Sequence, residues 1–506
     1  MERDWIRWNG WGDQGHDEAL AMNEHAWRWL AQSFAMPALL ATPARTGAAL
    51  PPPRLAGRDQ FIALLGAAGV QQDDASRMRH AAGKDLADLL RLRGGDFSTA
   101  PDAVLTPRHE EDVLAALKLC ADLGVAVVPF GGGTGDVTPV RGAHSSIIAL
   151  DMSGLNRVTS LDTMSGLAEV EAGITGPELE RQLAAHGMTL GHRPGDFENS
   201  TLGGWIAEGG DACEWLRGLR VATPQGLLVS ETRAPDLSHL MRGSRGAFGV
   251  ITRATIRIQA QPETDEYRGY LFPDFAAGLA AMREVQRRGL PHVLMQLSDD
   301  GETRFCRAMQ RTGWNLREHM FDVYLAVRRF DGSAARLLAG FSGRESEVRA
   351  ARKAFDRLAK KLGAIALGVD NNWRRRRFAS RRDSLLDRGT GMDRLEISAS
   401  WSQLPLLYVT VRAALKQAMR VQVPRAGAHG LVLVQVGSAR ADGATLTFTW
   451  AFPRKLEDEI AQAQAIRHAA LTAIGGREGA ELERGLQRAI KQALDPEGIL
   501  NPGKLV

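Results

Sequence analysis

The sequence predicts an α+β protein with two modules, and three observations lead to this prediction. A short apolar stretch, an amphipathic helix and an apolar run follow one another between residues 101 and 128 and end in a cluster of glycines. An alternating apolar strand pattern covers residues 251–258. Strand-like and helical runs then alternate from about residue 262 to 460, as expected for a sheet covered by helices.

The composition excludes several classes of protein. A chain of 506 residues with 44% hydrophobic residues can bury a large core, and its length suggests about two to four domains. The net charge of +4 comes from 63 basic and 59 acidic residues, too mild to indicate a nucleic-acid partner. The three cysteines lie far apart, so we expect no disulfide framework, no metal site and a reducing compartment.

Targeting signals are not evident in the sequence. The N-terminus lacks a basic start followed by an apolar core, and no run of about 18 apolar residues occurs. The last residues are Lys504-Leu505-Val506 and not the peroxisomal Ser-Lys-Leu. We therefore expect a cytoplasmic protein without a membrane span.

The first module is predicted at residues 98–260, after a leader at 1–97 that is rich in Trp, Ala and Pro. A short strand near residue 104, a proline stop and an acidic helix start come first. Apolar positions from Leu114 to Leu123 then give one helix face, and the run at 125–128 reads as a buried strand. This is a strand, helix and strand unit that leads into the glycine cluster.

The glycine cluster at 129–136 is the strongest candidate for a binding site. Consecutive glycines let backbone N–H groups turn toward an anion, because residues without Cβ reach left-handed conformations at no steric cost. The cluster is neither a Walker A motif nor a full dinucleotide fingerprint, and by itself an ordinary tight turn is an equal alternative. The residues predicted to hold a diphosphate here are Pro129, Gly131, Gly132, Gly133, Thr134, Gly135 and Asp136.

A second loop at 194–204 offers backbone donors, hydroxyls and close approach to a flat ring. Thr201 is equally suited to be a helix N-cap, and Asp196 to be an Asx-turn residue. The candidate ligand residues in this loop are Pro194, Gly195, Asp196, Ser200, Thr201, Gly203 and Gly204.

The second module is predicted at 261–455 as a substrate cap, an α+β domain with a sheet covered by helices. Strand-like runs at 431–436 and 444–452 alternate with helical runs at 275–288 and 345–362. Residues 456–506 contain two helical stretches, which we expect to return to the first module.

Several segments of the chain occur in the order found in the FAD-linked oxidases of the vanillyl-alcohol oxidase type. The chain resembles that family, and within it the alkylglycerone-phosphate synthases of ether-lipid synthesis. The segments that carry the resemblance are residues 7–12, 90–97, 129–137, 170–176, 194–205, 243–252 and 495–504.

The resemblance implies FAD as the cofactor. The loop at 129–136 would wrap the diphosphate, the loop at 194–204 would lie along the ribityl chain and flavin ring, and a third segment would hold the adenine half. Its residues are Gly243, Gly246, Gly249 and Ile251, with Arg245 either pairing with a phosphate or facing solvent. Since the 129–137 loop has no His or Cys, we expect non-covalent FAD.

A basic run at 374–377 has three interpretations: a solvated helix face, contacts with anionic lipid heads, or an anion site. A guanidinium fork matches phosphate or carboxylate. Arg377-Phe378, followed by Arg382-Asp383, resembles a pattern of bacterial synthase relatives, so Arg377 is the predicted partner of the substrate anion.

The catalytic motifs of the resembled enzymes are missing. The synthases carry a run of histidines where this chain has residues 475–483 without one, and hydroxy-acid dehydrogenases carry a Glu-His-Gly motif there. A tyrosine is replaced within 445–450, and an arginine near Leu433 is absent. We therefore assign no catalytic residue from the sequence.

Two histidines remain as candidates for other roles. His429 is the nearest one that could act as a base, although a turn residue is the simpler interpretation. His192 precedes the second loop and either orients the cofactor or makes a structural hydrogen bond.

Three functions follow as hypotheses. The chain is a synthase-type flavoenzyme with a relocated base, an FAD-dependent oxidoreductase of small hydroxy acids or aldehydes, or a catalytically degenerate flavin-binding paralogue. The expected partner is a small-molecule or lipid-phosphate substrate, with peripheral lipid contact and a homodimer left open.

Overall fold

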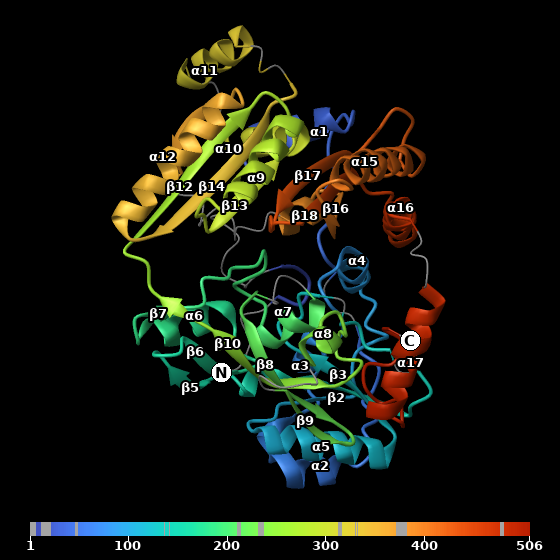
Figure 1. Cartoon of the computed structure of the whole chain (residues 1–506). Coiled ribbons are helices and arrows are strands. Elements are labelled where there is room, and N and C mark those ends of the chain that lie inside the picture. The colour runs from blue at the N-terminus through green and yellow to red at the C-terminus, as the bar shows by residue number, and fades with distance from the viewer. Residues whose placement is uncertain are drawn as a thin grey trace. The chain divides into compact units, whose positions relative to one another are not determined.

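The computed structural model describes residues 7–11, 22–45, 49–135, 137–140, 142–209, 214–230, 237–311, 316–328, 330, 332–370, 382–475 and 480–505. The chain forms two compact units (Figure 1). The first unit contains Met1–His16, Ala44–Gln261 and Arg477–Val506, and the second contains Asp17–Pro43 and Pro262–Gly476. Of the predicted return segment, α16 (Glu459–Ala473) therefore clusters with the second unit and α17 (Ala480–Leu494) with the first.

The first unit begins with a four-stranded sheet in the order β1-β2-β4-β3. Strands β2, β4 and β3 are parallel, and β1 pairs with β2 in the antiparallel sense. The predicted strand, helix and strand unit is confirmed as β2, α5 and β3. The bounds are β1 (Val70–Gln71), β2 (Ala103–Leu105), α5 (Glu110–Leu123), β3 (Val125–Phe130) and β4 (Ser146–Asp151).

The packing of α5 explains why the glycine loop starts where it does. Val113, Leu117 and Cys120 on one face of α5 pack into the same core cluster as Val125 and Val127 of β3. Gly124 ends the helix in the left-handed conformation, with φ 63°. The strand then runs buried up to the glycine loop. Helix α2 (Arg58–Leu65) packs beside α5.

A second, antiparallel sheet of the first unit has the order β5-β6-β10-β8-β9. Its strands are β5 (Val158–Asp162), β6 (Leu167–Glu171), β8 (Leu216–Thr223), β9 (Gly226–Ser230) and β10 (Val250–Arg257). The predicted alternating strand is β10. The accompanying short elements are η1 (Ala67–Gly69), α3 (Asp74–Arg79), α4 (Leu86–Arg93), η2 (Met152–Gly154), α6 (Gly176–Ala184), β7 (Met188–Thr189), α7 (Leu202–Glu208), α8 (Leu237–Met241) and β11 (Gln259–Ala260).

The second unit is built on a seven-stranded sheet in the order β15-β12-β14-β13-β17-β18-β16. All of its pairings are antiparallel. Its strands are β12 (Thr264–Phe272), β13 (Leu294–Ser298), β14 (Ala335–Gly343), β15 (Ile365–Val369), β16 (Thr390–Ser400), β17 (Leu431–Gly437) and β18 (Gly443–Pro453).

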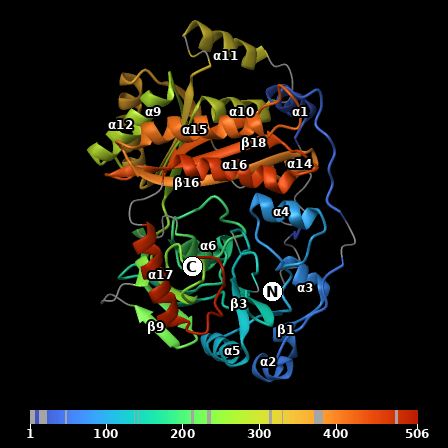
Figure 2. The same ribbon diagram turned by 90° about the vertical axis from the view of Figure 1, so that its right-hand side faces the viewer.

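Helices pack against this sheet, which confirms the α+β architecture predicted for the module (Figures 1 and 2). In β18, Leu446, Phe448 and Trp450 are fully buried on one face, while the threonines between them point to the other face. The helices of this unit, besides α16, are α1 (Glu24–Ser33), α9 (Phe275–Arg288), α10 (Asp300–Gln310), α11 (Leu316–Val327), α12 (Glu345–Lys361), α14 (Arg382–Asp387) and α15 (Leu404–Val421).

Among the described residues, no helix combines the length and the apolar character that crossing a bilayer requires.

Candidate flavin site

The glycine loop and the 194–204 loop, which were predicted as separate parts of one site, contact each other in the first unit. A Cβ added at Gly131 would lie 2.4 Å from Thr201 Oγ1, and one added at Gly132 would lie 1.9 Å from the main-chain oxygen of Asn199. Neither position therefore has room for a side chain. The glycines allow the two loops to lie backbone against backbone.

Backbone donors of the glycine loop are left for a ligand. Gly132 and Gly133 are buried, and no hydrogen bond within the described part of the chain uses the N–H of Gly132, Gly133 or Thr134. A buried amide without a partner is costly, and successive amides of this kind form an anion-binding concavity. The loop thus fits the diphosphate of FAD. Asp136, predicted as part of the same loop, lies outside the described residues.

The 194–204 loop is held by its own backbone and by a helix cap. The main-chain oxygen of Asp196 accepts from the N–H groups of Asn199 and Ser200, so the bonds that shape this turn run to the Asp196 backbone. Thr201 is the N-cap of α7, with its Oγ1 3.3 Å from the Gly204 nitrogen. Thr201 is therefore an N-cap, as one of its two interpretations expected, and its role as a cofactor ligand stays a prediction.

Gly203 is required by packing, because its N–H donates to the Ala172 oxygen at 2.8 Å and an added Cβ would lie 2.9 Å from the Ala172 Cβ. Pro194 and Gly195 lie at the start of the same turn. The Pro194 oxygen accepts from the Phe197 nitrogen at 3.2 Å, and Gly195 is exposed. Their ligand roles stay predictions.

An aromatic cluster lies along this loop. The His192 ring is 5.8 Å from that of Trp205 and 5.5 Å from that of Trp215, and Phe197 stacks on Trp205 at 6.1 Å. Trp205 Nε1 donates to Ser200 Oγ. The sequence did not predict the part played by Trp215, because it lies ten residues beyond Trp205 and joins the cluster only through folding.

The third predicted segment, 243–251, is divided between the site and the sheet. A Cβ added at Gly246 would lie 2.9 Å from the Pro129 ring, so this turn packs against the start of the glycine loop. Gly249 packs instead against Val221, and Ile251 pairs with Val221 inside the second sheet. Gly243 has a positive φ of 75° in the turn between α8 and β10. Arg245 is exposed, and its pairing with a cofactor phosphate stays a prediction.

A buried carboxylate ties α5 to the second sheet of this unit and was not predicted. Glu110, at the start of α5, accepts hydrogen bonds from Arg220 of β8 and from Thr252 Oγ1 of β10, the latter at 2.6 Å. Burial raises the pKa of Glu110, but the hydrogen bonds from Arg220 and Thr252 outweigh it, and the pKa lies below its ordinary value. The carboxylate fixes α5, and with it the strand that carries the glycine loop.

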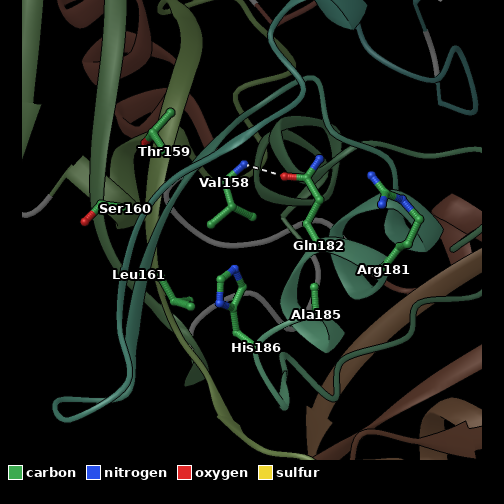
Figure 3. Close-up of a pocket in the computed structure, with 8 residues that line it drawn as sticks. All are labelled: Val158, Thr159, Ser160, Leu161, Arg181, Gln182, Ala185 and His186. Carbon is green, nitrogen blue, oxygen red and sulfur yellow. Dashed lines mark hydrogen bonds between the residues drawn. The ribbon is translucent and has the colours of Figure 1, made fainter.

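A surface cavity of about 350 Å³ lies between β5 and α6, and none of the predicted cofactor residues lines it (Figure 3). Gln182 Oε1 accepts from the Val158 nitrogen, and Arg181 pairs with Glu178. Its lining residues are Val158, Thr159, Ser160, Leu161, Arg181, Gln182, Ala185 and His186. Because Gln182 and Arg181 are already partnered by the protein, we do not assign this cavity to the cofactor.

The second unit contains the predicted candidates Arg377 and His429. Arg377 lies outside the described residues. His429 is exposed in the loop between a turn at 426–427 and β17, with its Nδ1 3.4 Å from the Gly427 oxygen. Among the described residues, no group of three His, Cys, Asp or Glu side chains is placed to hold a metal ion.

A cluster of charged residues at the junction of β13 and α10 is the chief feature of this unit that the sequence did not reveal. Asp299 is fully buried and caps α10, and it also accepts from the Val434 nitrogen at 3.1 Å and from the Tyr408 hydroxyl at 3.3 Å. Burial raises the pKa of Asp299. Burial and the nearby Asp299 charge also raise the pKa of Glu302, to about 8.

Comparison with known proteins agrees with this site. The FAD-binding domain model matches residues 101–231, and the model of the C-terminal domain of FAD-linked oxidases matches residues 261–481 and 472–505. The alkyldihydroxyacetonephosphate synthase of Trypanosoma brucei brucei is 28% identical, over 99% of this chain and 92% of that protein. The synthase of Dictyostelium discoideum is 29% identical, over 86% of this chain and 78% of its own length.

A solved alkyldihydroxyacetonephosphate synthase superimposes with a TM-score of 0.85 at 26% identity, covering 100% of both chains. The two domain models follow one another along the chain and account for most of it. The paired loops with their unused amides fit the cofactor that these models imply. The chain belongs to the FAD-linked oxidase family, and FAD is its cofactor.

Proposed function

We propose that this chain is a flavoenzyme of the alkyldihydroxyacetonephosphate synthase type, which exchanges the acyl group of an acyl-dihydroxyacetone phosphate for an alkyl group. The observation that carries the proposal is that the similarity to the synthases runs through both units and not through the FAD-binding unit alone. A shared cofactor site would not by itself identify the substrate.

The proposed exchange sets clear chemical demands. A long-chain alcohol supplies the alkyl group and a fatty acid leaves, so the reaction has no net change of oxidation state and consumes no electron acceptor. FAD, when bound, supplies a ring that can accept and return electrons. The protein must hold the phosphate, keep water from the reacting carbon and take up a proton from the substrate. Arg377 stays the predicted partner of the phosphate.

The test is the absorbance of the purified yellow protein under anaerobic conditions. If the proposal is correct, an acyl-dihydroxyacetone phosphate bleaches the flavin, a long-chain alcohol restores it, and no oxygen is consumed in air. Bleaching by a 2-hydroxy acid, with electrons passed to an added acceptor, would replace the proposal by the oxidoreductase alternative. A protein that binds FAD but responds to neither class would be the degenerate paralogue.

A further inference from the structure

The end of the chain lies against the strand that leads into the glycine loop. In the first sheet β3 is an edge strand, and residues 499–501 cover its open edge (Figure 2). The Val127 nitrogen donates to the Ile499 oxygen at 2.8 Å, and the Asn501 nitrogen donates to the Val127 oxygen at 2.7 Å. We call residues 495–504 the C-terminal tail. Its central residues act as an additional strand beside β3.

A buried ion pair holds the tail in this position. Asp495 is 1% exposed, and its carboxylate accepts from the nitrogens of Ile499 at 3.1 Å and Leu500 at 2.8 Å. Lys491, on the last turn of α17, pairs with Asp495 at 2.5 Å and also donates to the Leu500 oxygen. The two side chains therefore fix both the N–H and the C=O of the residue that lies beside Val127.

The same lysine reaches the turn that packs on the glycine loop. Lys491 Nζ donates to the Ala247 oxygen at 2.9 Å, and the Asn501 side-chain amide donates to the Arg245 oxygen at 2.5 Å. Between these two residues stands Gly246, which has no room for a Cβ against Pro129. The tail thus holds the first residue of the glycine loop from two directions, through β3 and through the 245–247 turn.

The Lys491 charge is partly desolvated and is held by the oxygens of Asp495, Ala247 and Leu500. Burial lowers the pKa of Lys491, although the hydrogen bond and charge of Asp495 oppose the shift. Truncating one member of a buried, hydrogen-bonded pair leaves the other uncompensated. In this case the Asp495 carboxylate would keep the hydrogen bonds from Ile499 and Leu500 but lose its countercharge, and the carbonyls of Ala247 and Leu500 would lose the hydrogen bonds that Lys491 donates.

We propose that the tail is a working part of the FAD site, in which Lys491 is a positioning residue that aligns the amides of residues 132–134 for the diphosphate. Lys491 acts through the 245–247 turn and the end of β3 and does not itself touch the cofactor. Docking of the tail and binding of FAD must then stabilise each other, because the coupling free energy between two binding events is reciprocal.

The first experiment measures FAD affinity of the full chain after removal of its cofactor, by quenching of flavin fluorescence. Lys491→Met is expected to raise the Kd for FAD at least tenfold, and Asp495→Asn to raise it in the same direction. Lys118→Met is the matched control, since Lys118 is an exposed lysine on α5 of the same unit. It should leave the Kd within twofold. An unchanged Kd in a folded Lys491→Met protein would overturn the proposal.

The second experiment needs no variant and decides the matter if Lys491→Met does not fold. Amide hydrogen exchange is compared between the FAD-bound and the FAD-free wild-type protein. Exchange at Val127, Ile499, Leu500 and Asn501 is expected to slow at least tenfold more on FAD binding than exchange in the pairing of β5 with β6. Equal slowing in both regions, or none in the tail, would mean that the tail has only a general structural role.

Discussion

At the scale of single residues, the shape of the glycine loop depends on what surrounds it. Gly132 faces the backbone of Asn199, which cannot move aside as a flexible side chain would. Asn199, its neighbour in space, lies far from it in the sequence. The loop is therefore sensitive to substitutions that local rules for turns would tolerate.

We predict that Gly132→Ala disturbs the site strongly. The new Cβ would lie 1.9 Å from the Asn199 oxygen, so the loops must separate, at a cost of about 1–3 kcal/mol as for other overpacked sites. Urea unfolding and the FAD content of the purified protein measure the effect. Gly485→Ala is the control, because this helical glycine has no atom within 4 Å of an added Cβ. It should gain about 0.5–1 kcal/mol.

The lowered pKa of Glu110 predicts that the free energy of unfolding falls at acidic pH. Its pKa is lower in the folded than in the unfolded protein, so the stability it contributes is present above its ordinary pKa of 4.5. That stability is lost as the pH falls through the lower folded value. Glu110→Gln should cost about 2 kcal/mol at pH 7, because Arg220 loses a charged hydrogen-bond partner, and clearly less near pH 3. Urea unfolding at both pH values measures this, and equal losses would contradict it.

At the scale of elements, α7 carries part of the predicted flavin segment in its first turn. The cap from Thr201 to Gly204 fixes the point at which the helix begins, and Thr201 is also the residue that Gly131 approaches. The Thr201 hydroxyl group therefore both fixes the conformation of residues 200–204 and lies where the glycine loop contacts the 194–204 loop.

We predict that Thr201→Ala lowers the free energy of unfolding by about 1 kcal/mol, the usual cost of losing an N-cap, and speeds hydrogen exchange at the Gly204 amide. Thr201→Ser keeps the hydroxyl and should retain most of the stability and the FAD affinity. If Thr201→Ser behaved like Thr201→Ala, the methyl group and not the cap would be the important feature.

At the scale of the whole molecule, the chain divides into two compact units, and the predicted cofactor residues belong to the first. Ligand binding stabilises the part of a protein that binds it, by about 2.7 kcal/mol when the ligand is at 100 times its Kd. Each unit has a sheet and a core of its own.

Calorimetry of the FAD-free chain should accordingly give two transitions. Added FAD should raise the first-unit transition by roughly 5–10 °C at 100 times its Kd and shift the other much less. Gly132→Ala identifies the first-unit transition, because it should lower that one selectively. A single transition that moves as a whole would show that the units unfold together.

The sequence alone determined much of this protein, because several of its signals are local. The apolar face of α5, the buried run of β3 and the glycine cluster after it follow from periodicity and from the special conformations of glycine, and the structure has them at the predicted positions. The order of the motifs along the chain predicted the family and its cofactor, FAD.

Tertiary structure decided what depends on distant partners. That Gly131 and Gly132 must be glycine is set by residues 199–201, and that Lys491 matters is set by Ala247 and Leu500. No pattern within a segment records such contacts, because burial and hydrogen bonding between remote segments arise only when the chain folds. The same holds for Glu302, an ordinary acidic residue in the sequence whose pKa is raised by its surroundings.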